Sequence, residues 1–259
     1  MPEQSEGERV PSDIEDVTPG WNARVAGRLQ GALQRCALRD DIRRILVDGE
    51  RGPQTGRVHA LGRCMDLLIA TLALILVAPL LAVVACLVAL ECSGPVLFRH
   101  ARIGRGGQTF QVLKFRTMHV DGDAILRDHL FENEAARQEW ALDRKLRRDP
   151  RVSQLGSLLR KSSLDELPQL VNVLRGEMSI VGPRPIVAAE VQRYGSFFRA
   201  YCSVRPGITG VWQVSGRNDI SYRRRVAMDA LYARKKSVLF DLQLIAATIP
   251  AVLSRRGSY

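Results

Sequence analysis

An uncharged apolar run from Leu67 to Leu90 constrains the fold of this chain more than any other feature. At about 1.5 Å per residue, a helix of this length can cross a bilayer core of roughly 30 Å. Pro79 stands in the middle of the run, where it removes one backbone hydrogen bond and crowds the preceding turn. We therefore predict a membrane helix that is kinked or broken at Pro79.

Basic residues flank this run on both sides. Arginines 51, 57 and 63 precede it, and the basic residues that follow it are Arg99, Arg102, Arg105, Lys114 and Arg116. Positive charge marks the cytoplasmic side of membrane segments, so both ends are expected there. A helix that enters, breaks at Pro79 and returns to the same face meets this requirement. A kinked crossing helix and a buried helix of a soluble protein are the alternatives.

Composition outside the run indicates a globular body with anionic partners. The 38 basic and 27 acidic residues give a net charge of +11, which favours nucleic acid, anionic lipid or phosphorylated substrates. The five cysteines form no C-x-x-C pair, and the histidines lack metal-ligand spacing. This pattern argues against a zinc site and a disulfide scaffold, and it fits a reducing cytosolic compartment.

Changes in composition divide the chain into four predicted segments. Residues 1–20 are acidic and poor in apolar residues, which predicts a disordered tail. Residues 21–56 show apolar positions at helical spacing between arginines, and such a helix could pack on the body or lie on anionic lipid. Residues 57–95 form the predicted re-entrant membrane hairpin, and residues 96–259 form the globular domain.

A β-hairpin is predicted at the start of the globular domain. Residues 96–103 and 109–117 read as strands, and the glycine-rich residues 104–107 supply the turn. Strand alternation places Lys114 and Arg116 on one face, where two cations suit a phosphate group. A solvated basic face is the alternative. Helical patterns at residues 121–148 and 238–253 make the predicted fold α/β and mainly helical.

Two adjacent acids, Asp165 and Glu166, are the candidate catalytic residues. Ser163 and Glu166 match the S-x-x-E capping box, which offers a purely structural explanation. Pro168 makes the start of that helix irregular. Adjacent helical residues project about 100° apart, which implies different roles. One carboxylate could attack phosphorus while the other handles a proton or Mg²⁺, an ion that prefers oxygen ligands.

Two turn clusters follow the acids. Prolines at 183 and 185 restrict the backbone on either side of Arg184, which would suit a phosphate clamp. Arg160, just before the acid pair, is a further candidate for a diphosphate. Residues 205–210 form the second cluster and lead into residues 211–218. Purely structural turns are the alternative explanation.

Taken together, these motifs resemble one family. KFRTM at 114–118, SLDELPQL at 163–170, VGPRP at 181–185 and RPGITG-x-WQVSGRN at 205–218 follow a single membrane segment. This order resembles the bacterial sugar transferases, which are monotopic phosphoglycosyl transferases acting on undecaprenyl phosphate. The resemblance covers roughly residues 60–259 and is specific because several long motifs recur in order. VGPRPIV, WQVSGRND and the ending SRRGSY resemble the exopolysaccharide-initiating members in particular.

The resemblance implies a small catalytic domain on the cytoplasmic face of the bacterial inner membrane, anchored by a re-entrant helix hairpin and amphipathic helices. Asp165 matches the nucleophile, which takes a sugar 1-phosphate from UDP-galactose or UDP-glucose, releases UMP and passes the phosphosugar to undecaprenyl phosphate. Glu166 matches its partner, and both acids would hold Mg²⁺. Pro79 matches the break in the membrane helix. The expected substrate-binding residues are Lys114, Arg116, Arg160, Arg184 and Arg217.

Two features depart from the family pattern. Ala78 stands before Pro79, where the family often has serine, and residues 1–56 have no counterpart in the small members. Nucleic acid is not an expected partner, and a homo-oligomer is left open. The competing hypotheses are a non-catalytic basic module that binds membrane or nucleic acid, and an assembly protein that kept the fold without the activity.

Overall fold

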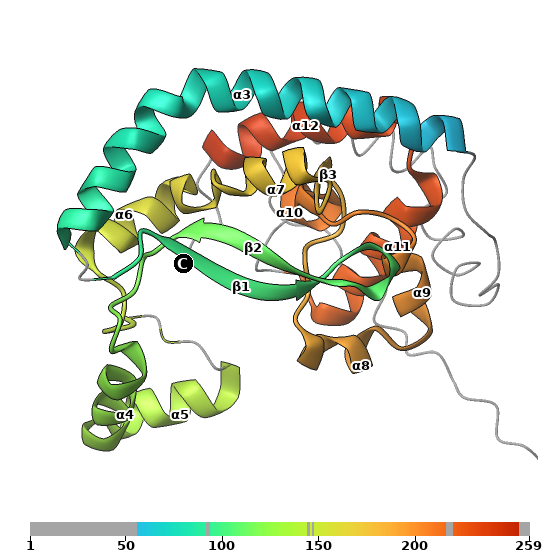
Figure 1. The fold of residues 1–259 in the computed structure, drawn as a ribbon. Helices are drawn as coiled ribbons and strands as arrows, with labels where there is room; N and C mark the ends of the chain where they lie inside the picture. Colours follow the sequence, from blue (N-terminus) through green and yellow to red (C-terminus); the bar gives the residue numbers. More distant parts are fainter. Residues whose placement is uncertain (1–55, 92–93, 144–145, 147, 216–219, 254–259) are drawn as a thin grey trace, which may run out of the picture. The chain divides into compact units, whose positions relative to one another are not determined.

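The computed structural model describes residues 56–253 except 92–93, 144–145, 147 and 216–219. The segments predicted for residues 1–20 and, except for Gly56, 21–56 lie outside the described residues, as does the candidate Arg217. The helices and strands run in the order α3 (Gly56–Glu91), β1 (Leu97–Ile103), β2 (Thr109–Phe115), α4 (Gly122–Glu132), α5 (Glu134–Asp143), α6 (Gln154–Ser162), α7 (Gln169–Arg175), β3 (Ser179–Val181), α8 (Val191–Tyr194), α9 (Phe198–Cys202), β4 (Gly207–Thr209), α10 (Val211–Ser215), α11 (Tyr222–Lys235) and α12 (Val238–Leu253) (Figure 1).

The prediction of a mainly helical fold with a small β-hairpin is confirmed. Strands β1 and β2 pair antiparallel from Leu97 opposite Phe115 to Ile103 opposite Thr109. Gly106 and Gly107 have φ values of 69° and 77°, the left-handed region that favours glycine, so the residues predicted for the turn make it. Helix α12 has the predicted bounds. The stretch predicted at 121–148 forms two helices, α4 and α5, separated at Asn133.

Pro79 lies inside one helix, because α3 continues from Gly56 to Glu91 without an interruption. Figure 1 shows α3 as a single curved helix rather than two separate arms. The two halves pack on different clusters of buried side chains. Before Pro79, Ala70 and Val77 belong to the main core; after it, Val84 and Val88 pack with residues of β2 and α6. The proline thus stands where the helix passes from one core cluster to the other.

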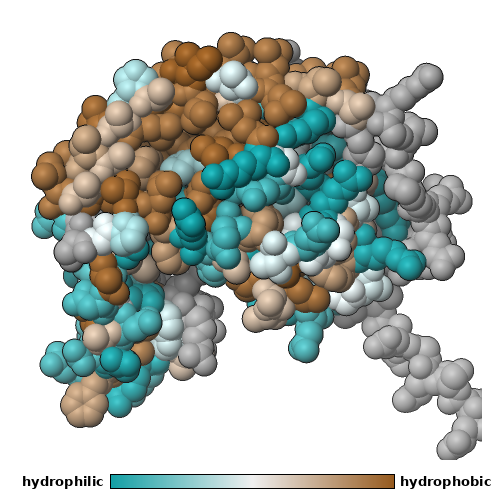
Figure 2. Space-filling view, viewed as in Figure 1, coloured by the Kyte–Doolittle hydropathy of each residue, from teal (hydrophilic) through white to brown (hydrophobic). Residues whose placement is uncertain are grey.

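The outer side of α3 is apolar and exposed. Leu76 is 81% exposed and Leu90 is 85% exposed, and Leu68, Leu72, Ile75 and Val83 are also largely uncovered. Figure 2 shows the corresponding hydrophobic surface along this helix. Residues 60–91 are long and apolar enough to cross a membrane, and only 11% of the most apolar window is buried. An exposed apolar surface of this extent is not that of a core helix in a soluble protein.

Both ends of α3 are attached to the globular domain by polar side chains. Near the first end, Arg63 donates to the carbonyl oxygens of Val173 and Leu174 at 2.7 and 3.1 Å. At the second end, Glu91 accepts from the Ser153 hydroxyl at 2.6 Å and from the Leu155 N–H at 3.2 Å. The apolar middle of α3 is therefore bracketed by contacts to one and the same domain.

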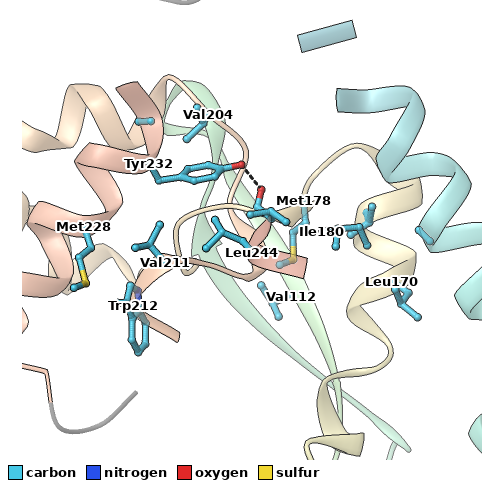
Figure 3. Close-up of a cluster of buried hydrophobic side chains, with 14 of the residues drawn as sticks. Val112, Leu170, Met178, Ile180, Val204, Val211, Trp212, Met228, Tyr232 and Leu244 are labelled. Carbon is cyan, nitrogen blue, oxygen red and sulfur yellow. Dashed lines mark hydrogen bonds between the residues drawn. The ribbon is translucent and has the colours of Figure 1, made fainter. Parts of the chain in front are cut away.

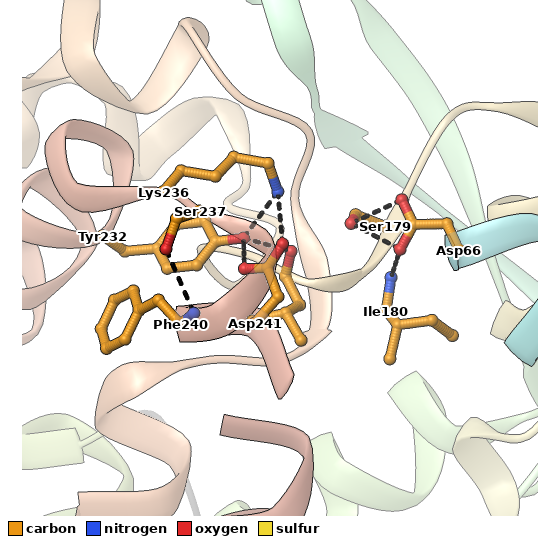
Figure 4. A network of polar contacts seen from close by, with 9 residues as sticks. Asp66, Ser179, Ile180, Tyr232, Lys236, Ser237, Phe240 and Asp241 are labelled. Carbon is orange, nitrogen blue, oxygen red and sulfur yellow. Dashed lines mark hydrogen bonds and ion pairs between the residues drawn. The ribbon is translucent and has the colours of Figure 1, made fainter. Parts of the chain in front are cut away.

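Buried Asp66 adds to the attachment at the first end. Its carboxylate accepts from the Ser179 hydroxyl, at 2.8 and 2.9 Å for its two oxygens, and from the Ile180 N–H at 2.9 Å (Figure 4). These bonds satisfy a carboxylate that would otherwise be costly to bury. They fix α3 directly to strand β3.

The main core lies between α3, α7, the short strands and the C-terminal helices. Met178, Trp212, Tyr232 and Leu244 are among its buried side chains (Figure 3). The Tyr232 hydroxyl is 2.8 Å from the Val181 carbonyl oxygen. Figure 4 shows this hydroxyl in a network with Lys236 and Asp241, a buried ion pair 3.2 Å apart. The network joins α11 and α12 to β3.

The two turn clusters predicted from the sequence pack directly on each other. Strands β3 and β4 pair in parallel, and the Gly182 N–H donates to the Thr209 carbonyl at 2.9 Å. A Cβ atom at Gly207 would lie 2.0 Å from the Gly182 nitrogen, so the two backbones meet where no side chain fits. This contact holds the loop that carries Arg184 beside the loop at residues 205–210.

Candidate active site

The acid pair lies on a short 3₁₀ turn, Leu164–Glu166, between α6 and α7. The capping-box explanation of Ser163 is wrong. Ser163 adopts the left-handed conformation with φ of 59° at the end of α6, and its side chain makes no capping bond. An N-cap needs extended backbone, and Ser153 fills that role for α6. Among the described residues Ser163 is the one non-glycine with positive φ, which is strain of the kind that gathers at functional sites.

The two acids point into different environments, as the sequence predicted. Residues of a 3₁₀ turn project about 120° apart. Asp165 is only 8% exposed, whereas the Glu166 side chain is 36% exposed. Burial raises the pKa of Asp165 to about 6, with the Lys114 charge opposing the rise and Glu166 adding to it. Asp165 is thus a poorly solvated carboxyl group with a perturbed pKa, which makes it a candidate catalytic residue.

Two of the predicted basic residues surround this pair. Lys114 on β2 places its Nζ atom 2.5 Å from Glu166 Oε1. Arg160, in the last turn of α6, donates from Nε to the Thr117 hydroxyl at 2.9 Å and acts electrostatically on Asp165. The hairpin and α6 therefore bring positive charge to the acids from two directions, as a diphosphate substrate would require.

The remaining candidates take different positions. Arg184 is exposed between buried Pro183 and Pro185, with its guanidinium carbon 5.8 Å from the centre of the Trp212 ring. Arg116 follows the end of β2 and donates from Nε to the Pro95 carbonyl at 2.8 Å, so it holds the segment between α3 and β1. Substrate binding by Arg116 and Arg217 stays a prediction.

Arg102, which the sequence predicts only as a flanking charge, is a further candidate residue of the site. It donates to the Pro185 carbonyl at 3.1 Å and therefore lies beside the loop of Arg184. Burial lowers the pKa of Arg102 and Arg184 acts in the same direction, whereas Glu190, Tyr201 and, more weakly, Glu166 oppose them. Arg102 thus lies beside the Arg184 loop, within the electrostatic reach of Glu166. The hairpin register could have revealed this position, because residues 98, 100 and 102 share a face with Lys114.

The acid pair fits Mg²⁺ in ligand type and number. Mg²⁺ is held in many phosphate-handling enzymes by one or two carboxylates together with substrate phosphates. Among the described residues no group of three or more His, Cys, Asp or Glu side chains is placed to hold a metal. A site formed by Asp165 and Glu166 would therefore depend on oxygens of the substrate.

A buried carboxylate beside a second acid, faced by lysine and arginine, defines a site suited to phosphoryl transfer. Comparisons with known proteins agree with this class. A model of the bacterial sugar transferase family matches residues 57–255. The chain therefore belongs to the bacterial sugar transferase family, and it is an enzyme of the phosphoglycosyl transferase class.

Several curated relatives support this placement. The exopolysaccharide production protein ExoY of Sinorhizobium fredii is 52% identical over 80% of this chain and 93% of its own length. The undecaprenyl-phosphate galactose phosphotransferase of Salmonella typhimurium is 42% identical over 77% of this chain and 42% of its own length. The UDP-glucose:undecaprenyl-phosphate glucose-1-phosphate transferase of Escherichia coli is 38% identical over 80% of this chain and 43% of its own length.

Proposed function

We propose that this enzyme transfers a sugar 1-phosphate from UDP-galactose or UDP-glucose to undecaprenyl phosphate and so initiates exopolysaccharide synthesis. The names of the relatives in Sinorhizobium, Salmonella and Escherichia support the reaction class and both kinds of substrate. The observation that carries the proposal is the position of Asp165, a buried carboxylate next to Glu166 and facing Lys114 and Arg160. A non-catalytic basic module would have no need to bury one carboxylate of such a pair.

The reaction proceeds in two displacements at one phosphorus atom. A carboxylate oxygen of Asp165 attacks the phosphorus bonded to the sugar, the bond to the bridging oxygen breaks, and UMP leaves with the electron pair. A phosphate oxygen of undecaprenyl phosphate then attacks the same phosphorus. The bond to Asp165 breaks, and the carboxylate is regenerated as undecaprenyl diphosphate sugar forms.

The basic residues stabilise the negative charge of these steps. Lys114 and Arg160 lie beside the acid pair, and Arg102 and Arg184 extend the positive charge away from it. Asp165 and Glu166 would hold Mg²⁺, which supplies charge neutralisation on the diphosphate.

Thorough chelation should abolish turnover, and added Mg²⁺ should restore it. Full activity after chelation would contradict the metal requirement.

We also propose that α3 enters the cytoplasmic leaflet of the inner membrane and returns to the same side. The support comes from the exposed apolar surface of the helix, together with Arg63 and Glu91, which attach its two ends to one domain. A straight crossing would place one of these ends on the far side of the bilayer. This placement puts the catalytic domain next to the lipid substrate.

Intact-protein mass spectrometry tests the covalent step. Wild-type enzyme mixed with the correct nucleotide sugar, without lipid, should gain the mass of one phosphosugar, and Asp165→Asn should gain nothing. Asp128→Asn, which changes an exposed carboxylate on α4, is the matched control and should be loaded like wild type. Loading of Asp165→Asn, or kinetics that require both substrates bound together, would overturn the mechanism.

A further inference from the structure

The outer strand of the hairpin places two ring side chains next to the acid pair. In the antiparallel register Phe98 lies opposite Lys114, and His100 lies two positions along the same face. Lys114 in turn contacts Glu166. Phe98 and His100 therefore belong to the surface of the hairpin that borders the site, and no step of the proposed mechanism uses them.

Phe98 and His100 form a pair with defined geometry. Their ring centres are 5.9 Å apart and the planes meet at 67°, an edge-to-face contact. Phe98 is 46% exposed, and His100 is exposed as well. An aromatic ring and an imidazole that pack on each other yet remain open to solvent offer a surface to a ligand.

The chemistry of His100 is set by its basic neighbours. Arg102 Nη2 lies 3.3 Å from His100 Nδ1, and because a guanidinium has only donors, Nδ1 accepts. The ring is then neutral, with its hydrogen on Nε2. The partial burial of the ring lowers the pKa of His100, and the positive charges of Arg102 and Lys114 lower it further. The imidazole thus supplies a neutral hydrogen-bond donor among cations.

This combination suits a sugar better than a phosphate. Lysine and arginine supply the charge that phosphate oxygens need, whereas a neutral N–H is matched to a hydroxyl. The exposed face of Phe98 can pack against the apolar C–H groups of a sugar ring. Lys114, which shares this face of the hairpin, contacts Glu166 of the acid pair that is proposed to act on the phosphorus bonded to the sugar.

We infer that His100, together with Phe98, contacts the hexose of the nucleotide sugar and discriminates between donors by their hydroxyl groups. The inference rests on the proposed function and adds a specificity-determining position to the same site. UDP-galactose and UDP-glucose are suitable probes because they differ only in the orientation of one hydroxyl. A hydrogen bond to that hydroxyl would favour one donor and leave the imidazole unpaired with the other.

The test is the ratio of kcat/KM for the two donors, measured at saturating undecaprenyl phosphate. His100→Ala and His100→Gln should each change this ratio about tenfold or more, and Phe98→Leu should raise KM for the preferred donor. His119→Gln, which changes another exposed histidine in the loop after β2, should leave the ratio as in wild type. Thermal unfolding of each variant checks that the hairpin is intact.

The outcomes separate the inference from the proposed function. If the His100 variants lose kcat/KM equally with both donors, the role of His100 is unrelated to the sugar and the inference is overturned. If the KM of Phe98→Leu for the preferred donor equals that of wild type, Phe98 does not contact the sugar. Absence of turnover of either donor by wild-type enzyme would refute the proposed function, and the inference with it.

Discussion

Lys114 and Glu166 are separated by 52 positions in the chain, yet the Lys114 Nζ atom lies 2.5 Å from Glu166 Oε1. The contact joins strand β2 to the 3₁₀ turn that carries both acids. Because Lys114 also opposes the rise in the pKa of Asp165, one cation acts on both members of the pair. The hairpin therefore sets the electrostatic state of a turn that lies far from it in sequence.

Replacing Lys114 should damage turnover more than stability. Lys114→Met leaves Glu166 without this partner and removes a charge that a phosphoryl group would meet, so kcat should fall by about 10² or more. Lys114→Arg keeps the charge but not the shape of the side chain, so its kcat should fall less than that of Lys114→Met. Lys161→Met removes an equal charge from the exposed end of α6. Steady-state kinetics of the three variants check this, and an equal loss in Lys114→Met and Lys161→Met would contradict it.

Both flanks of α3 should lie on the cytoplasmic side. In a variant whose natural cysteines are replaced, a single cysteine at position 20 or at position 257 should react with a membrane-impermeant thiol reagent only after the cells are permeabilised. The bracketing contacts of Arg63 and Glu91 are the physical reason. Labelling at position 20 but not at position 257 in intact cells would show a crossing helix.

Gly207 should tolerate no side chain. A methyl group there would lie 2.0 Å from the Gly182 nitrogen, a backbone atom that no side-chain rotation can move away. Gly207→Ala should cost about 3 kcal/mol of unfolding free energy or prevent folding. Gly62→Ala is the control, because nothing lies within 4 Å and alanine favours a helix by about 1 kcal/mol. Yield and thermal unfolding in detergent measure the difference, and similar behaviour of the two variants would sink the prediction.

Stability should fall as pH rises because of Asp229. This buried acid accepts from the Tyr194 hydroxyl at 2.8 Å, and burial raises its pKa to about 8. Its ordinary value is about 3.9, so between these values the folded protein holds a proton that the unfolded chain has lost. The favourable contribution of that bound proton declines as pH approaches 8.

Asp229→Asn removes this titration while keeping an oxygen that can accept from Tyr194. Its melting temperature should therefore fall less than that of wild type between pH 5 and pH 8. Asp128→Asn, on the exposed surface of α4, should follow the wild-type curve. Parallel curves for wild type and Asp229→Asn would show that Asp229 is not the group responsible.

Local patterns in the sequence predicted the elements with strong local signals. The glycine turn at residues 104–107 fixed the hairpin, and the apolar spacing of residues 238–253 fixed the last helix. The divergence of Asp165 and Glu166 followed from helical geometry and is confirmed by their different burial. In each case the signal that predicts the local structure lies among neighbours in the chain.

Contacts between distant residues decided the features that sequence did not predict. Ser163 matched a capping box, but its backbone is left-handed because α6 ends there and the chain must turn toward α7. Pro79 suggested a kink or a break, and α3 runs on through it while its two halves pack on two separate core clusters. Arg102 joined the site only through strand pairing and the Pro185 carbonyl.

The hydrogen bonds from Arg63 to the end of α7 link the motion of two helices. Helix α7 begins just after the acid pair, and its last carbonyls are held by a residue of the helix that we place in the lipid. A change in the lipids of the leaflet that α3 enters would tilt that helix. The tilt would be transmitted through Arg63 to the turn that bears Asp165. Lipid composition would then tune the rate of this enzyme.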